Sequence, residues 1–160
     1  MAAMTAREFA DEIVAPTIRD FMETPDRRRA YLACIVTYHL GDYLSLAAHA
    51  DARAALGLPF VAFERMCNAA KHREATRGKA TRMASGSDTV RPVSGFGVSD
   101  WGDTRIGDRG GVYVEHDGRK YDMLDLCLIV VRHYADRYQD ELRGSAVTQF
   151  RWNTKVYPAS

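Results

Sequence analysis

The sequence predicts a mainly α fold: a four-helix bundle with a β-hairpin and a long loop inserted between helices 3 and 4. Three observations lead to this fold class. Apolar residues recur at helical spacing over most of the chain, an Asp-Gly pair stands between two short β-prone runs, and 160 residues suit one domain. We therefore expect a single domain over residues 1–160, with residues 78–121 as the insertion.

Capping residues place the first two helices. Thr5 and Glu8 have the spacing of a capping box, so the first helix begins there and runs for about four turns, and Pro16 is expected to kink or split it. Thr24-Pro25-Asp26 combines a capping residue with a proline at the first helical position and begins a second helix. No breaker follows before Gly57, so this helix is expected to be long and central to the bundle.

The second half of the chain predicts two more helices around the insertion. A third helix follows Gly57 and runs to about Gly78. Residues 78–111 are rich in Gly, Ser, Asp and Arg and read as a loop, and residues 112–121 read as a hairpin around Asp-Gly. A fourth helix is expected from 122 to 144, with no clear element after it.

Composition excludes several classes of protein. Hydrophobic residues make up 46% and charged residues 27%, which is ordinary for a globular protein and unlike disordered chains. The longest apolar run is too short to cross a bilayer, and the first ten residues lack the order of a secretion signal, so we expect no membrane association and a cytoplasmic location. The three cysteines lie in apolar helical runs and are expected to be buried, reduced thiols.

Positive charge is concentrated in one segment although the net charge is only +1. Residues 65–91 contain seven Lys or Arg and two Asp or Glu. Such a run is either a solvated helix end leading into a loop or a surface for a nucleic-acid backbone.

The third helix carries the main candidate site. Arg65, Asn68 and His72 are spaced i, i+3, i+7 and therefore share one helix face, and Lys71 flanks them. This face differs from the apolar stripe of the same helix. The cluster is either a solvated face or a site.

The second helix offers a polar pair that supports this site. His39 and Asp42 lie in line with Leu32, Ile35 and Leu46, so two polar residues interrupt an apolar face. When buried, such residues need partners. Two further histidines are not assigned to the site: His49 is expected to lie on the surface, and His116 is expected to be part of a turn.

Three interpretations of these residues remain open. In the first, they form a structural polar network or a surface face. In the second, His39, His72 and His133 bind a metal from three different helices, as helical bundles do elsewhere. In the third, they cleave RNA without a metal: a histidine moves a proton at the ribose 2′-hydroxyl or the leaving oxygen, and an arginine stabilises charge on the phosphate.

The motif resembles a known superfamily. Arg65, six residues and then His72 on the third helix of a bundle is similar to the Arg-then-His signature of the HEPN superfamily (higher eukaryotes and prokaryotes nucleotide-binding). The pair "HLGDYL" and "CNAAKH" also resembles small bacterial helical proteins that combine H-L-x-D with N-x-x-K-H. The resemblance covers residues 25–78, and the fourth helix matches more loosely.

The resemblance implies a function and partners. His72 would be the catalytic or phosphate-contacting histidine, Arg65 the phosphate clamp and Asn68 the polar residue inside the motif. HEPN domains pair two motifs in one cleft, which implies a homodimer. RNA would be the substrate, without a cofactor, and a toxin or defence module of this kind could have an antitoxin partner. The alternative is a non-catalytic nucleotide-binding or protein-interaction bundle. RNA backbone contacts would come from four residues of the basic segment: Arg73, Arg77, Lys79 and Arg82.

Overall fold

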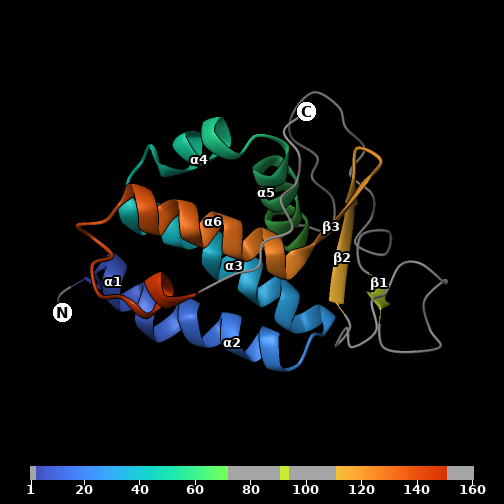
Figure 1. Cartoon of the computed structure of the whole chain (residues 1–160), viewed down its shortest axis with the longest axis horizontal. Helices are drawn as coiled ribbons and strands as arrows, with labels where there is room; N and C mark the ends of the chain where they lie inside the picture. The colour runs from blue at the N-terminus through green and yellow to red at the C-terminus, as the bar shows by residue number, and fades with distance from the viewer. Residues whose placement is uncertain (1–2, 72–90, 94–110, 151–160) are drawn as a thin grey trace.

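The structure is a computed structural model, and it describes residues 3–71, 91–93 and 111–150. These residues form a mainly helical fold with a small antiparallel sheet, as the sequence predicts (Figure 1). In Figure 1, α6 lies across α3, with α2 on one side of this pair and α4 and α5 on the other. None of the helices in the described residues is long and apolar enough to cross a membrane.

The first helical segment continues through Pro16. It consists of α1 (Ala6–Phe9), the π-helical turn η1 (Ala10–Val14) and α2 (Ala15–Glu23). The predicted capping box is present: the Thr5 hydroxyl accepts from the Glu8 N–H, and the Glu8 carboxylate accepts from the Thr5 N–H. Pro16 has no N–H and its ring crowds the carbonyl four residues earlier, so the wider turn just before it takes up the proline without ending the helix.

The prediction of one long second helix is wrong, because this part of the chain forms two helices, α3 (Arg27–Leu44) and α4 (Ala48–Leu56). The chain turns at Ser45, whose backbone is extended and whose Oγ accepts a hydrogen bond from the Ala47 N–H (3.1 Å). The start also differs. Asp26, not Thr24, caps α3, because its carboxylate accepts from the Arg29 N–H at 2.8 Å.

Gly41 allows α4 to fold back onto α3. A β-carbon at this position would clash with the imidazole ring of His49 and would lie 2.7 Å from the Tyr134 hydroxyl. Glycine is therefore required here by close approach, not by its backbone angles. A glycine inside a predicted helix indicates a close contact or a bend, but the sequence does not identify His49 as the residue that approaches it.

The remaining helices enclose the core. In α5 (Leu58–Lys71) the predicted stripe is buried, with Phe60, Phe63, Met66 and Cys67 at 0–1% exposure. The helix α6 (Met123–Arg137) begins at the predicted cap but ends seven residues before Gly144, where the chain turns toward the 3₁₀ turn η2 (Ala146–Gln149). The turn is held by Asp11, whose carboxylate accepts from the Ser145 hydroxyl (2.6 Å) and the Ala146 N–H (2.7 Å).

The predicted hairpin is confirmed. It is formed by β2 (Gly111–His116) and β3 (Arg119–Asp122), with His116 opposite Arg119. Asp117 and Gly118 both have positive φ, as a two-residue type I′ turn requires. A third strand, β1 (Arg91–Val93), pairs antiparallel with β2. The rest of the predicted 78–111 loop lies outside the described residues.

The three cysteines meet where α3, α5 and α6 contact one another. All three are buried free thiols, as expected. The Cys34 and Cys127 sulfurs are 3.5 Å apart, and the Cys67 thiol donates to the Cys34 carbonyl (3.2 Å). Burial raises the pKa of the Cys127 thiol well above its ordinary value, so these groups act as core residues and not as nucleophiles.

Candidate functional site

Arg65, the first residue of the predicted motif, lies against the hairpin. It is half-buried on α5, and its Nη1 is 3.2 Å from Nδ1 and 3.3 Å from Nε2 of His116. His116 is the last residue of β2 and is also half-buried. The fold thus brings together an arginine and a histidine that are 51 residues apart in sequence.

The alternation of β2 explains why His116 faces α5. Val112 and Val114 are buried, whereas Glu115 is exposed, so every second side chain of the strand points toward the helices. His116 continues the buried series at the end of the strand. The tight Asp117-Gly118 turn follows directly and fixes the register of β2 and β3 at this end of the hairpin.

The environment of His116 favours the neutral imidazole. Burial lowers the pKa of His116 below its ordinary value, and the positive charge of Arg65 lowers this pKa further, while Asp117 raises it in part. A neutral imidazole keeps one nitrogen with a free lone pair for accepting a proton or a hydrogen bond. The arginine contact is compatible with that state, since an N–H of Arg65 can donate to the unprotonated nitrogen.

The supporting residues His39 and Asp42 form a second polar cluster with His49. The His39 Nδ1 donates to the Asp42 Oδ2 at 2.6 Å, and the other oxygen of Asp42 lies 3.7 Å from the His49 Nε2. The same His49 nitrogen donates to the Tyr38 carbonyl (3.0 Å), and the His49 and Tyr38 rings are in contact at a tilt of 33°, with centroids 4.0 Å apart. His39 and Asp42 are exposed, with 41% and 52% of their side-chain surface accessible.

His49 differs from its expected surface position. Only 21% of its side chain is accessible, because the ring sits over Gly41 and against Tyr38 where α4 folds back. The Tyr134 hydroxyl reaches the same point of α3 from α6 and has no hydrogen-bond partner among residues 3–71, 91–93 and 111–150. Burial raises the pKa of Tyr134, so this hydroxyl stays protonated.

The other predicted site residues are placed only in part. Asn68 is half-buried on α5, one turn beyond Arg65, and Lys71 is the last residue of that helix. His72 lies outside the described residues, and so do the four predicted RNA-binding residues, Arg73, Arg77, Lys79 and Arg82. The structure therefore neither supports nor contradicts their predicted roles.

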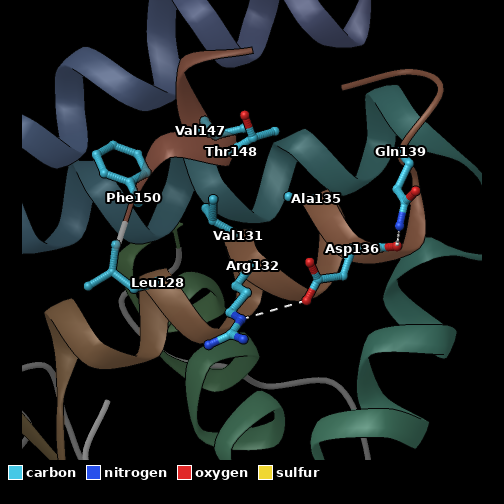
Figure 2. Close-up of a pocket in the computed structure, with 9 residues that line it drawn as sticks. All are labelled: Leu128, Val131, Arg132, Ala135, Asp136, Gln139, Val147, Thr148 and Phe150. Atoms are coloured by element: carbon cyan, nitrogen blue, oxygen red, sulfur yellow. Dashed lines mark hydrogen bonds and ion pairs between the residues drawn. The ribbon is translucent and has the colours of Figure 1, made fainter. Parts of the chain in front are cut away.

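A hollow of about 460 Å³ lies between α6 and η2, away from both polar clusters in sequence (Figure 2). Its lining mixes apolar and polar side chains, and the Nε of Arg132 is 3.6 Å from the Asp136 Oδ2. It contains none of the residues that the motif analysis selected. Its lining consists of Leu128, Val131, Arg132, Ala135, Asp136, Gln139, Val147, Thr148 and Phe150.

The metal interpretation gains no support from the described part of the chain. Within it, no three His, Cys, Asp or Glu side chains are grouped so that they could hold a metal ion. The proposed set of His39, His72 and His133 includes a residue outside that part. Comparison of the chain with protein-family models, curated proteins and solved structures gave no match.

Proposed function

We propose that this chain is a HEPN-like protein that binds RNA and cleaves it without a metal ion, as part of a toxin or defence module. The contact between Arg65 and His116 carries the proposal. It places a forked cationic donor and a neutral proton acceptor within 3.3 Å of each other, half-buried at the surface of a helix. These are the two groups that metal-independent cleavage of a phosphodiester uses.

The resemblance assigns the other roles. Arg65 would clamp the phosphate with two N–H groups, as a guanidinium does better than an ammonium. Asn68, one turn along the same helix, would position the phosphate or the histidine, and His72 would transfer a proton. The basic segment that begins at this end of α5 would hold the RNA backbone. We also propose that the helices of this chain correspond to the four-helix bundle of the superfamily.

A second candidate function rests on the His39–Asp42–His49 cluster. His39 is hydrogen-bonded to Asp42, and His49 is hydrogen-bonded to the Tyr38 carbonyl, which joins α4 to α3. This arrangement is typical of a structural polar network. In that case the chain would be a non-catalytic nucleotide-binding or protein-interaction bundle. A partner protein such as an antitoxin would bind the face of α3 on which His39 and Asp42 are exposed.

A homodimer is also part of the proposal, and a face of α3 supports it. Five residues of α3 at heptad-like spacing form what we name the α3 stripe, in which Leu32 is 42% exposed. Its N-terminal end is basic and its C-terminal end is acidic. Two antiparallel copies would place the Arg28 end of one beside the Asp42 end of the other. The stripe consists of Arg28, Leu32, Ile35, His39 and Asp42.

The oligomer is tested by gel filtration with light scattering. We expect twice the mass of one chain for the wild type and the mass of one chain for Leu32→Asp. Met22→Asp is the matched control, because Met22 is exposed to a similar extent (37%) but lies on α2. A wild type that runs as a single chain, or a Met22→Asp variant that dissociates equally, contradicts this interface.

The cleavage proposal is tested with a mixed RNA substrate in EDTA. We expect the wild type to cleave, and His72→Ala and Arg65→Gln to lose activity while circular dichroism shows them folded. Arg119→Gln, which removes an exposed positive charge from the neighbouring strand, is the matched control and should cleave normally. A pure wild-type protein that leaves the RNA intact and shows no affinity for it excludes the RNA function and favours the protein-interaction bundle.

A further inference from the structure

His116 lies beside Arg65 but is not part of the motif that the sequence predicts. It comes from the hairpin insertion, not from the helices that resemble the superfamily. Three features set the position of its ring. The alternation of β2 turns it toward α5, the Asp117-Gly118 turn ends the strand directly after it, and the Nη1 of Arg65 contacts both ring nitrogens. An ordinary turn residue would be exposed, as Asp117 and Gly118 are.

Cleavage of RNA by its own 2′-hydroxyl needs two proton transfers. One group must remove the proton of the hydroxyl, and another must protonate the departing 5′-oxygen. A single histidine cannot be unprotonated and protonated at the same time, so a second group that titrates near neutrality accelerates the reaction. We propose that His116 is the general base of this site and acts on the ribose 2′-hydroxyl of a phosphodiester bound by Arg65. This inference rests on the proposed RNA cleavage.

The step is balanced as follows. The lone pair of His116 takes the proton of the 2′-hydroxyl while the 2′-oxygen forms a bond to phosphorus. The bond from phosphorus to the 5′-oxygen breaks, and that oxygen takes a proton from an acid or from water. The products are a 2′,3′-cyclic phosphate and a free 5′-hydroxyl, and His116 later returns its proton to solvent. No oxidant, reductant or metal is required.

Arg65 serves the base in two ways. Without substrate, its Nη1 lies beside both ring nitrogens, and its positive charge disfavours a protonated His116. When a phosphate binds, the guanidinium N–H groups have a stronger acceptor in its oxygens. The lone pair of His116 is then released next to the bound phosphodiester. Within the described residues, Asp117 in the turn and Arg119 opposite on β3 also lie next to His116, and both are exposed.

The test compares wild type, His116→Gln and His133→Gln with an RNA substrate in EDTA at saturating concentration. His133 is the matched control, because it is a half-buried histidine on α6 whose pKa burial also lowers. We expect His116→Gln to cleave roughly 100-fold or more slowly than wild type while binding the RNA with similar affinity. We expect His133→Gln to cleave at the wild-type rate, and a substrate with 2′-deoxyribose at the cleaved position to remain intact.

A dependence on pH separates a base from a residue that only positions Arg65. The wild-type rate should fall with acid as His116 becomes protonated, and this fall should be absent in His116→Gln. Added imidazole should restore part of the activity of His116→Ala, since a free base can enter the space of the lost ring. If His116→Gln does not fold, His116→Asn and the acid limb of the wild-type profile give the same information.

The outcomes distinguish this inference from the proposed function. If wild type cleaves and His116→Gln cleaves equally well, His116 is not the base, although the RNA function stands. The same conclusion follows if the deoxy substrate is cut, or if imidazole has no effect and the acid limb persists in the variant. If wild type does not cleave RNA at all, both the proposed function and the role of His116 are overturned.

Discussion

The two polar clusters of this protein differ in how their charges are balanced. Around Asp42, a carboxylate lies between the imidazoles of His39 and His49. Around Arg65, a guanidinium lies against an imidazole, so protonation of His116 would bring two positive charges within 3.3 Å. In the first arrangement the anion has a hydrogen-bond donor, the Nδ1 of His39. The second is favourable only while His116 is neutral.

This difference supports the proposal that the Arg65–His116 pair is the reactive cluster. Structural networks pair opposite charges or complete their hydrogen bonds, as His39, Asp42 and His49 do. A site that must receive an anion keeps a cation and a proton acceptor together before the anion arrives, and this lowers stability in acid. The Arg65–His116 pair has the second property. The predictions below compare the two clusters, beginning with the change of largest expected effect.

Gly41→Ala should disrupt the structural cluster most strongly. The new methyl group would clash with the His49 ring and press on the Tyr134 hydroxyl, which costs about 1–3 kcal/mol of unfolding free energy despite the better helix propensity of alanine. Urea unfolding measures the loss. The double variant with His49→Ala is the control, and it should recover part of the stability because the clashing ring is removed. A single variant as stable as wild type contradicts the packing of α4 on α3.

Arg65→Gln should raise the pKa of His116. The positive charge that helps to lower this pKa is then absent, and only burial still lowers it. Titration of the histidine Cε1–H signals by NMR measures the shift. Arg119→Gln, on the strand opposite His116, provides the control for a general change in charge. An unchanged pKa of His116 in Arg65→Gln would mean that the two side chains are not in contact in solution.

Acid should destabilise the wild type more than His116→Gln. The pKa of His116 in the folded protein is below the ordinary value of 6.5, so the unfolded chain binds more protons when the pH falls through 6.5 toward the folded pKa. Stability is therefore lost in that window and retained above it. Urea unfolding at a series of pH values compares the two proteins. Because burial also lowers the pKa of His133, a smaller acid effect should remain in the variant. Identical pH profiles would exclude this linkage.

His39→Ala should have the smallest effect on stability. Its ion pair with Asp42 is exposed on both sides, and exposed pairs contribute about 0–1 kcal/mol. A shift in melting temperature near the error of the measurement is expected, whereas His49→Ala, which removes a ring packed on Tyr38, should lower it more. A large loss in His39→Ala alone would contradict the small contribution expected of an exposed ion pair.

Secondary structure was predicted correctly where it depends on residues that are close together in the sequence. The capping box at Thr5, the cap at Asp122 and the Asp117-Gly118 turn are all present, because each depends on residues within three positions of one another. The break at Ser45 was missed because helix propensity and apolar content continue through it. The fold-back after Ser45 brings His49 against Gly41, a contact that only the folded chain contains.

The candidate site was predicted to a smaller extent. Arg65 and the His39–Asp42 pair were selected by their spacing, and the structure shows the pair hydrogen-bonded as i, i+3 neighbours on one helix. His116 and His49 were assigned to a turn and to the surface. The signal for His116 was the alternation of Val112, Val114 and His116, which places all three on one face of a strand.

The sequence by itself determined the helical class, the hairpin and the buried thiols, because caps, turns and apolar periodicity act between near neighbours in the chain. Only the tertiary structure decided which residues meet across elements: Arg65 with His116, His49 with Gly41, and Asp11 with Ser145. The physical reason is that such contacts depend on how helices and strands pack, and packing is set by the shape and volume of the whole core and not by any one segment.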